Sequence, residues 1–334
     1  MRRLLLLACL ALTACLPQLD GVDPARLPEP SDWGPNPAPT EWWYVSSYLP
    51  EANLAFHWAL FKAYPPPDYW VGGLPIALLF PGPFHAAHLA VTDLATGQLL
   101  FQERSDFPRG GPASISFPPL RLTLDDWQLT QSAAGFHLQA GPLDVTLTPL
   151  KPPVVHPPGY SGDERVGRLY YQSYTRLDLE GHILGQEVSG PAWMDHQWGE
   201  QQAGPKAIWD WFGLHLDNGL DLMFYQVKDR TGQPVMLQGT WVDEQGTIHP
   251  LSDLRMTPLE RWTSPSGRTY AVAWRVEADG LFLVLRPLRL EQELLTSTTR
   301  VAYWEGPVAG YGSWKETPVQ AWGMGEFVAG PYSP

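Results

Sequence analysis

The stretch Pro191-Ala192-Trp193-Met194-Asp195-His196-Gln197-Trp198-Gly199, followed closely by Trp209-Asp210-Trp211-Phe212-Gly213, contains four tryptophans, two aspartates and one histidine. Ionisable groups among large aromatic side chains are costly to bury unless they are paired. Such a concentration indicates either a walled ligand cavity or an unusually aromatic core.

Short strands with high β propensity extend on both sides of this stretch. The folded body begins near Thr40, where Glu41 to Leu49 is rich in aromatic residues and Leu54 to Tyr64 is a suitable hairpin partner. Further short runs recur at regular spacing between Gly, Pro and Asp turns, which predicts an antiparallel sandwich or barrel. The two halves have similar strand counts, so we expect two β-barrel-like domains that meet near residues 199–206. Trp193 to Gly199 then closes the first domain and Trp209 opens the second.

Three segments between the strands have their own signals. Asp217-Asn218-Gly219 is typical of a tight hairpin turn. Residues 151–165 are rich in Pro and Gly and predict a long loop, a lid or a rim. The best candidate for a short helix is Leu290 to Leu295, and no long amphipathic pattern is present.

Composition limits the class of protein. The chain has 334 residues, of which 44% are hydrophobic and 17% charged, so it can bury a large core and is not a disordered sequence. The 35 prolines and 31 glycines indicate many turns. The formal charge of −13 argues against nucleic acid or an anionic lipid surface as a partner.

The N-terminus resembles a targeting segment. Arg2 and Arg3 precede an apolar run from Leu4 to Leu12, which is too short to span a bilayer as a helix. Leu12-Thr13-Ala14-Cys15 then resembles a bacterial lipobox, in which cleavage precedes Cys15 and that residue carries the lipid. The alternative is an ordinary signal peptide with an incidental cysteine.

Only two cysteines occur, Cys9 in the expected signal segment and Cys15 at the expected lipid site. The mature chain would therefore hold no disulfide, no thiolate nucleophile and no Cys-ligated metal. The Pro-rich residues after Cys15 predict a tether. We expect four parts: a signal peptide and lipobox at 1–15, a flexible tether at 16–39, an N-terminal barrel at 40–203 and a C-terminal barrel at 204–334.

Several motifs occur in a fixed order along the chain: Glu41-Trp42-Trp43-Tyr44, Ala87-His88-Leu89-Ala90, Glu103-Arg104, Tyr170-Tyr171-Gln172-Ser173-Tyr174-Thr175-Arg176-Leu177, Ala192 to Gly199, Trp209-Asp210-Trp211-Phe212 and Tyr303-Trp304-Glu305-Gly306-Pro307-Val308. This ordered set resembles the carotenoid 1,2-hydratase (hydroxyneurosporene synthase) and AttH-like family, often labelled predicted secreted hydrolases. The resemblance implies an all-β fold of two tandem lipocalin-like antiparallel barrels with few short helices. Relatives include hydratases and cyclases of polyketide-type substrates.

Strand alternation divides the candidate catalytic residues between faces. On an extended strand His196 and Trp198 point the same way, whereas Asp195 points to the other side. The resemblance suggests a hydratase, in which a buried carboxyl with a raised pKa protonates an alkene and aromatic faces stabilise the cation. His196 would then activate water. The candidate catalytic residues are His196, Asp195, Trp198, Asp221 and Tyr225.

A second group of residues is expected to bind the ligand. Its members are Glu41, Trp43, His88, Trp193, Trp209 and Trp211. Structural roles compete with each assignment, because the tryptophans suit a core and Asp195 and His196 suit backbone hydrogen bonds where the domains join. Glu41, His88 and Arg104 also suit a buried ionic network in the first barrel.

Other chemistries lack their motifs. His85 and His88 would lie on opposite faces of a strand, and the sequence after His196 has no second histidine of a zincin helix. No Gly-x-Ser-x-Gly elbow, phosphate-binding loop or Rossmann pattern occurs. We therefore predict no metal and no cofactor.

Two functions from different classes remain. The first is a cofactor-independent hydratase, or a related lyase or isomerase, that acts on an apolar isoprenoid- or polyketide-like molecule. The second is a non-catalytic lipoprotein that binds or carries a hydrophobic ligand. In both, the protein is exported and anchored in the bacterial cell envelope through Cys15.

Overall fold

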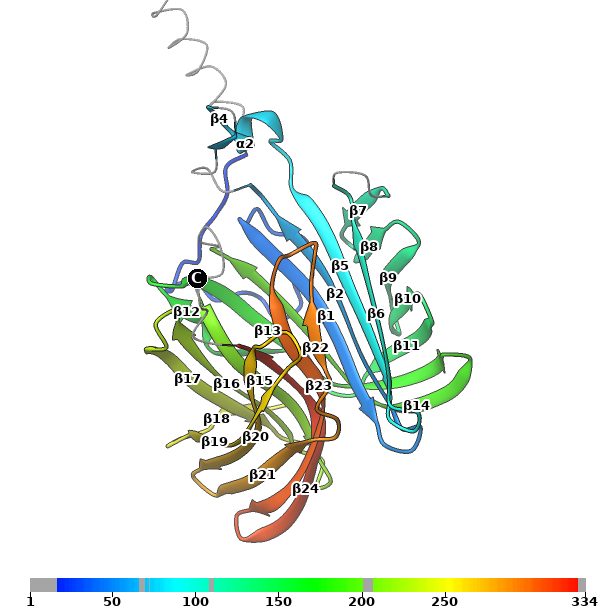
Figure 1. Cartoon of the computed structure of the whole chain (residues 1–334), viewed down its shortest axis with the longest axis vertical. Coiled ribbons are helices and arrows are strands. Elements are labelled where there is room, and N and C mark those ends of the chain that lie inside the picture. Colours follow the sequence, from blue (N-terminus) through cyan, green and yellow to red (C-terminus); the bar gives the residue numbers. More distant parts are fainter. Residues whose placement is uncertain (1–16, 66–69, 72, 108–110, 201–206, 330–334) are drawn as a thin grey trace, which may run out of the picture.

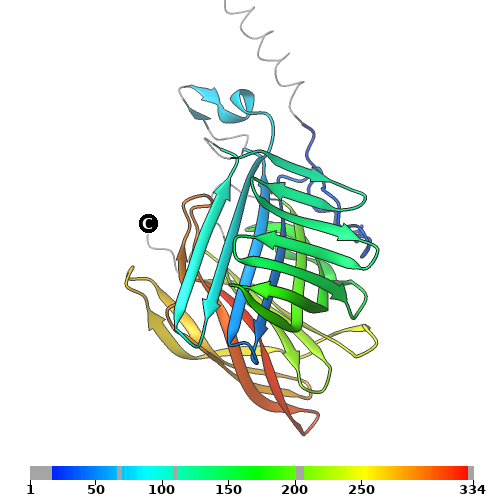
Figure 2. The same cartoon turned by 90° about the vertical axis from the view of Figure 1, so that its right-hand side faces the viewer.

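Two curled antiparallel sheets make up nearly the whole protein, as a computed structural model shows (Figures 1 and 2). The structure describes residues 17–65, 70–71, 73–107, 111–200 and 207–329. The expected lipid site at Cys15 lies outside the described residues, as do Cys9 and most of the expected domain boundary.

The first sheet is built from residues 40–199. Its strands run in the order β6-β5-β2-β1-β14-β13-β11-β10-β9-β8-β7, and β12 adds to β13. The strands are β1 (Thr40–Leu49), β2 (Leu54–Ala63), β5 (Phe84–Asp93), β6 (Gln98–Ser105), β7 (Ala113–Ser116), β8 (Arg121–Leu124), β9 (Trp127–Ser132), β10 (Gly135–Ala140), β11 (Leu143–Pro149), β12 (Val154–Asp163), β13 (Gly167–Ile183) and β14 (Gln186–Gly199).

The second sheet is built from residues 207–328. Its order is β18-β17-β16-β15-β24-β23-β21-β20-β19, and β22 adds to β23. The strands are β15 (Ala207–Leu216), β16 (Asp221–Asp229), β17 (Pro234–Val242), β18 (Ile248–Pro250), β19 (Arg255–Thr263), β20 (Thr269–Ala278), β21 (Leu281–Pro287), β22 (Glu293–Leu295), β23 (Ala302–Trp314) and β24 (Thr317–Val328). A small hairpin of β3 (Trp70–Val71) and β4 (Leu74–Pro75) precedes the short helix α2 (Ile76–Leu79).

The predicted all-β, lipocalin-like fold is confirmed, and each sheet forms a half-barrel around its own core. Asp217-Asn218-Gly219 makes the hairpin turn between β15 and β16, with Gly219 in the left-handed region at φ 85°. Two local predictions were wrong. Residues 154–163 pair with β13 as strand β12, and residues 293–295 form strand β22 rather than a helix.

The two half-barrels pack against each other through their outer faces. Alternation on β1 sends Trp43 and Val45 into the first core, while Tyr44 points toward the second sheet and meets Trp211 edge-on with ring centroids 5.7 Å apart. We call this contact the inter-sheet layer. Its buried apolar members are Tyr44, Ala55, Ala59, Tyr171, Trp193, Trp211, Met223, Tyr225, Val227 and Met324.

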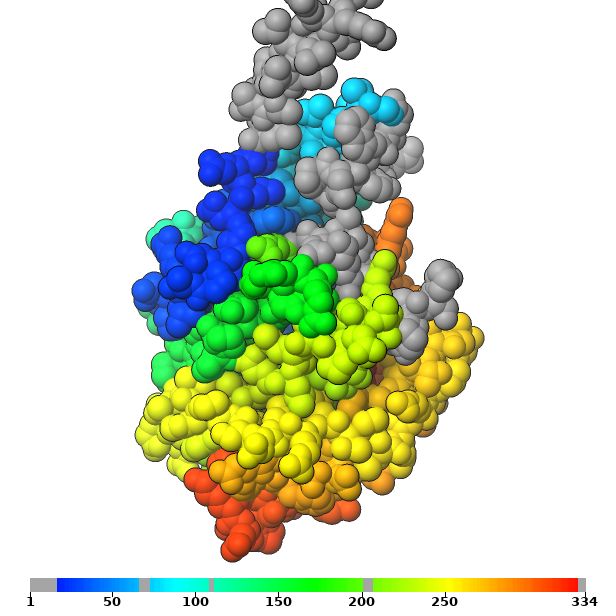
Figure 3. Space-filling model, turned by 90° about the vertical axis from the view of Figure 1, so that its left-hand side faces the viewer, coloured from blue at the N-terminus to red at the C-terminus, as the bar shows by residue number. Residues whose placement is uncertain are grey.

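Residues 22–38 depart from the expected flexible tether. They lie against the first half-barrel (blue in Figure 3), and Trp33 is fully buried in its core. The Trp33 ring stacks on Tyr174 at 4.8 Å between centroids, and its backbone carbonyl accepts a hydrogen bond from Trp43 Nε1 at 2.9 Å. A large aromatic in a polar, Pro-rich segment therefore completes the core rather than leading away from it.

Trp33→Ala should lower the free energy of unfolding by about 3–5 kcal/mol, because the substitution removes a buried indole and leaves a cavity. Urea denaturation of the mature chain measures this. Tyr311→Ala is the matched aromatic control: that side chain is 65% exposed, so its loss should cost no more than about 0.5 kcal/mol. Equal effects of the two substitutions would contradict the proposed place of Trp33 in the core.

Candidate functional site

Strand β14 divides its side chains between two environments, as alternation predicts. Ala192 and Met194 join the first core, and His196 lies on the same face. Trp193 and Asp195 point into the inter-sheet layer. The quoted stretch therefore supplies two separate polar sites, one on each face of the sheet.

Asp195 is buried in the inter-sheet layer without a cation. Its carboxylate accepts hydrogen bonds from Trp193 Nε1 at 2.6 Å, from the Tyr171 hydroxyl at 3.0 Å and from Ser173 Oγ. Among the described residues, no Lys or Arg forms an ion pair with it. Burial raises the pKa of Asp195 to about 7, and the three donors limit that rise. This carboxyl is therefore able both to hold and to release a proton near neutral pH.

A chain of hydrogen bonds connects Asp195 to the second sheet. The one hydroxyl proton of Ser173 is donated to Asp195, so its oxygen can only accept from His156. The Nε2–H of His156 therefore donates to Ser173 Oγ at 2.8 Å. Nδ1 of His156 then accepts from Thr240 Oγ1 on β17, also at 2.8 Å. Burial lowers the pKa of His156 to about 3, which keeps the ring neutral. The chain fixes how the two sheets meet at this carboxyl.

Two further carboxyls face the same layer from the second sheet. Glu305 on β23 and Glu326 on β24 are direct cross-strand partners. The Tyr44 hydroxyl donates to Glu305 at 2.6 Å, and Trp209 Nε1 donates to Glu326 at 3.1 Å. Burial raises the pKa of Glu326 to about 7, and the charge of Asp195 adds to the rise.

The pKa of Glu305 is raised well above its usual range, first by burial and then by Glu326. His57 lies beside it, with Nδ1 3.3 Å from Glu305 Oε2. Burial lowers the pKa of His57 to about 3, with a smaller contribution from His88. Sequence reasoning assigned no role to Glu305, Glu326 or His57. Only Glu305 had a signal, as part of the motif from Tyr303 to Val308.

His196 belongs to a different cluster, inside the first half-barrel. Its Nε2 lies 2.9 Å from Glu41 Oε1, and Glu41 also pairs with Lys62. The imidazole stacks on Trp43 at 4.8 Å and contacts Trp198 at 4.4 Å between ring centroids. Burial raises the pKa of Glu41, but His196 and Lys62 outweigh it and hold that pKa below its usual value. His196 thus stands apart from Asp195 and has a carboxylate partner of its own.

Asp221 forms a third cluster, in which two cations and a histidine surround it. Lys151 Nζ, Arg176 Nη2 and His215 Nδ1 lie 2.7, 2.8 and 2.8 Å from its oxygens. Burial raises the pKa of Asp221, but His215 and Arg176 lower it below the usual value. The charge is compensated within the fold, so this site ties β16 to the β11–β13 region rather than supplying a proton.

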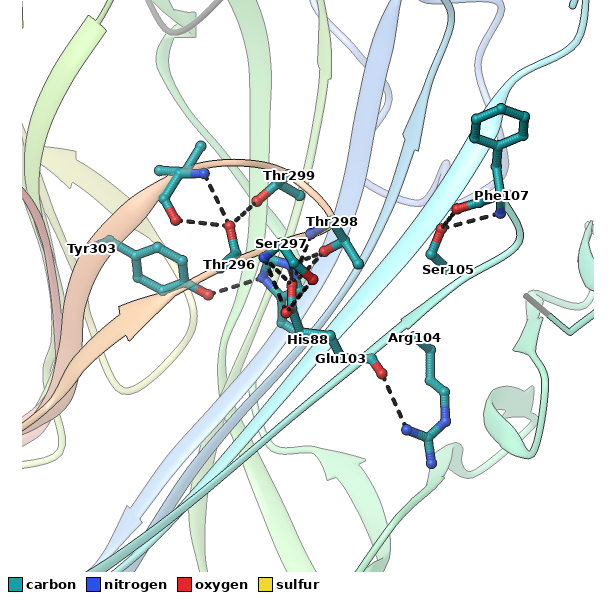
Figure 4. Close-up of polar contacts among 11 residues, drawn as sticks. His88, Glu103, Arg104, Ser105, Phe107, Thr296, Ser297, Thr298, Thr299 and Tyr303 are labelled. Carbon is teal, nitrogen blue, oxygen red and sulfur yellow. Dashed lines mark hydrogen bonds and ion pairs between the residues drawn. The ribbon is translucent and has the colours of Figure 1, made fainter. Parts of the chain in front are cut away.

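His88 lies at the far end of the layer, where a turn of the second sheet closes on the first (Figure 4). Its Nδ1 is 3.0 Å from the Tyr303 hydroxyl and its Nε2 is 2.8 Å from Thr298 Oγ1. Glu103 accepts hydrogen bonds from the backbone and side chains of Ser297 and Thr298. Arg104 points away and stacks on Trp127, so the expected network of Glu41, His88 and Arg104 does not form.

The inter-sheet layer gathers five of the sequence-predicted residues and leaves out the others. The Tyr225 hydroxyl donates to Gln238 at 2.9 Å, and Trp211 Nε1 donates to the Tyr171 hydroxyl at 2.8 Å. The five are Asp195, Tyr225, Trp193, Trp209 and Trp211. Glu41, Trp43, His196 and Trp198 lie in the first half-barrel, Asp221 lies in its own cluster, and His88 lies at the edge by Tyr303.

Several further features bear on the site. Within the described part of the chain, no group of three or more His, Cys, Asp or Glu side chains is arranged to hold a metal ion. Two surface hollows lie at hairpin ends, around residues 139–144 and 278–282, away from the inter-sheet layer. None of the described helices has the length and apolar character needed to cross a membrane.

Comparisons place the chain among known folds. The model of the AttH-like family matches residues 21–330. A crystal structure of an AttH protein from Nitrosomonas europaea is 25% identical, with a TM-score of 0.73 over 92% of this chain and 99% of that one. Kievitone hydratase from Nectria haematococca is 16% identical, with a TM-score of 0.66 over 93% and 96%. CghA with Sch210972 is 15% identical, with a TM-score of 0.58 over 96% and 97%. No curated protein matches the chain.

Asp221→Asn should lower the free energy of unfolding by about 3–5 kcal/mol at pH 7, because it leaves the buried Lys151 and the half-buried Arg176 without their counter-charge. The folded pKa of Asp221 lies below the unfolded value of about 3.9, so its stabilisation is present above that pH and is lost as pH falls through the folded pKa. Urea denaturation between pH 2 and pH 8 should show the two proteins converging at low pH. Asp217→Asn, at the exposed turn nearby, is the control, and a similar loss there would refute the assignment.

Proposed function

The chain belongs to the AttH-like family, and from this premise we propose that it is a cofactor-independent acid–base enzyme. The reaction class is that of a hydratase, or a related lyase or isomerase, on an apolar isoprenoid- or polyketide-like molecule. One observation carries the proposal. Asp195, Glu305 and Glu326 all face the inter-sheet layer with raised pKa values, and no Lys or Arg of the described residues pairs with them. Asp195 and Glu305 are buried and Glu326 is half-buried, and carboxyls with raised pKa values in such surroundings are typical of acid–base sites.

The two carboxyls whose pKa values are near 7 suit opposite roles in hydration. The charge of Asp195 raises the pKa of Glu326, and by reciprocity an ionised Glu326 favours the protonated form of Asp195. Protonated Asp195 transfers its proton to one alkene carbon, and the π electrons form the new C–H bond. The cation on the other carbon is then bonded by a water oxygen, while ionised Glu326 takes a proton from that water. Release of the proton from Glu326 and uptake of one by Asp195 reset the two carboxyls, and the net change is alkene plus water to alcohol.

The walls of the layer suit a cationic intermediate. Trp193 and Trp211 meet edge-on with centroids 6.2 Å apart beside Asp195. Indole faces attract cations, and burial strengthens that attraction. Kievitone hydratase, which has a similar fold, supports hydration as the reaction class by analogy.

A second candidate is a non-catalytic lipoprotein that carries a hydrophobic ligand. It is favoured by the pairing within the layer, where all three donors to Asp195 are protein groups. His196, Asp195 and Asp221 also lie in three separate clusters, rather than converging as a catalytic set. Lipocalin-type barrels are suited to hold one small ligand.

Turnover separates the two candidates. Squalene, farnesol and an acyclic carotenoid are incubated with the protein in H₂¹⁸O, and products are examined by mass spectrometry for one added water. Asp195→Asn should lower the rate by about 10²–10⁴-fold, because the proton donor is lost. Asp210→Asn is the matched control. Asp210 is also buried with its pKa raised to about 6, but it lies on the other face of β15 beside Gln226.

The outcomes are distinct. Loss of ¹⁸O incorporation in the Asp195 variant alone, with an unchanged melting temperature, supports catalysis at this carboxyl. Tight binding of the probes by the wild-type chain without any hydrated product supports the carrier. Equal activity of the two variants and the wild type rules out Asp195 as the acid.

We also propose that the protein is exported and anchored in the bacterial envelope by a lipid on Cys15. The n-region, the short apolar run and the lipobox pattern support this. In a bacterial host, Cys15→Ser should abolish incorporation of labelled palmitate and move the protein from the membrane to the soluble fraction. Cys9→Ser, within the signal segment, should leave both unchanged. Labelling that survives loss of Cys15 would contradict the anchor.

A further inference from the structure

One nitrogen of His57 is buried without a partner. The side chain of His57 is 2% exposed, and its Nε2 has no hydrogen-bond partner among the described residues. A buried polar group without a partner costs about 1–3 kcal/mol, so native structures rarely retain one without a reason. The other ring nitrogen, Nδ1, lies against Glu305 Oε2 at 3.3 Å.

The protonation of Glu305 and His57 determines whether Nε2 is a hydrogen-bond donor or an acceptor. Burial and the neighbouring Glu326 keep Glu305 protonated at neutral pH, and burial keeps His57 neutral with a single ring proton. The Tyr44 hydroxyl donates to Glu305 Oε1, so the carboxyl proton is on Oε2, which faces Nδ1. Nδ1 and Oε2 cannot both carry a proton where they face each other. The ring proton is therefore on Nε2, which makes it an unused N–H donor.

The surroundings of His57 suit a bound ligand atom. Ala55 and Ala59 flank it on the same face of β2, and Ala90 is its partner on β5, so only small side chains adjoin it within the sheet. The rings of Tyr44 and Tyr303 lie with centroids 6.2 Å from the imidazole on other sides. Ser46, the partner of His57 on β1, is also small. An unused polar donor among small and aromatic side chains is typical of sites that orient a mostly apolar ligand.

His57 and Asp195 share one face of the first sheet. Tyr44 pairs with Asp195 across β14 and with Ala59 across β2, and His57 is two residues along from Ala59. Strand spacing and rise place the two Cα atoms about 12 Å apart. A single molecule of moderate length therefore spans both groups.

We propose that His57, held by Glu305, is an oxygen-binding subsite of the inter-sheet layer, and that the ligand is an oxygenated apolar molecule rather than a pure hydrocarbon. The inference rests on the proposed function only in that a ligand enters this layer. The N–H of His57 donates to a carbonyl, ether or hydroxyl oxygen, while the apolar remainder extends toward Asp195. Within the proposed substrate classes, this favours polyketide-like and oxygenated isoprenoid molecules over isoprenoid hydrocarbons.

Binding of matched probes tests the subsite without requiring turnover. Farnesene, farnesol and farnesyl methyl ether share one isoprenoid skeleton. Farnesene has an additional double bond in place of the oxygen function, and the ether accepts hydrogen bonds without donating. Dissociation constants are measured by quenching of tryptophan fluorescence in the full chain. The alcohol and the ether should both bind about three- to tenfold more tightly than the hydrocarbon, which is the range expected for one net hydrogen bond.

Two amide variants provide the control. In His57→Gln the amide nitrogen takes the place of Nε2, so the preference for oxygenated probes should persist. In His57→Asn the amide reaches only the place of Nδ1, so the preference should vanish while affinity for farnesene stays within about twofold. Equal binding of the ether and the hydrocarbon by the wild type, or no binding of either oxygenated probe, overturns the inference. Asp195-dependent hydration of squalene would still stand in that event, so the two proposals fail separately.

Discussion

Side chains of a β-strand alternate between two faces, and in this protein both faces of the central strands are buried. Strands β1, β14 and β15 line a half-barrel core on one side and the inter-sheet layer on the other. Successive residues therefore face a half-barrel core and the inter-sheet layer in turn, and each side chain has to suit the environment that it faces. This explains why Met194 packs in an apolar core while its neighbour Asp195 accepts three hydrogen bonds. The rest of the arrangement follows from this double burial, because polar side chains in the buried part of β14, at residues 192–196, have no solvent to face.

The protein buries carboxyl groups in two physically different ways. Glu41 and Asp221 are surrounded by Lys, Arg and His partners, and their pKa values stay below the usual range despite burial. Asp195, Glu305 and Glu326 are instead held by neutral donors such as Tyr and Trp, and their pKa values rise. Compensated carboxylates stabilise the fold once buried, whereas uncompensated ones retain a proton that chemistry can use. Asp210, on the other face of β15, also has a raised pKa, but Lys228 lies 3.8 Å from its carboxylate and lowers that pKa.

Much of the fold was accessible from sequence patterns, and less of the site. High β propensity, regular turn spacing and the turn at Asp217-Asn218-Gly219 predict the two antiparallel half-barrels. Alternation also predicts that Asp195 and His196 face opposite ways. The carboxyls that face the same layer were not predictable, because Glu305 and Glu326 are far from Asp195 in the chain and face this layer only when the two sheets pack. Trp33 was misjudged because its neighbours have the composition of a linker, while burial of one indole decides its place.

The sequence by itself determined the class of fold, the family and the chemical character of the central stretch. Those properties depend on local propensity, on periodicity and on the order of motifs along the chain. Only the tertiary structure decided which carboxyls are charged in the fold and which retain a proton. The reason is that a pKa depends on burial and on the charges within a few ångströms. Lys151 and Arg176 reach Asp221, whereas no cation of the described residues reaches Asp195, and neither fact is written in the neighbouring sequence.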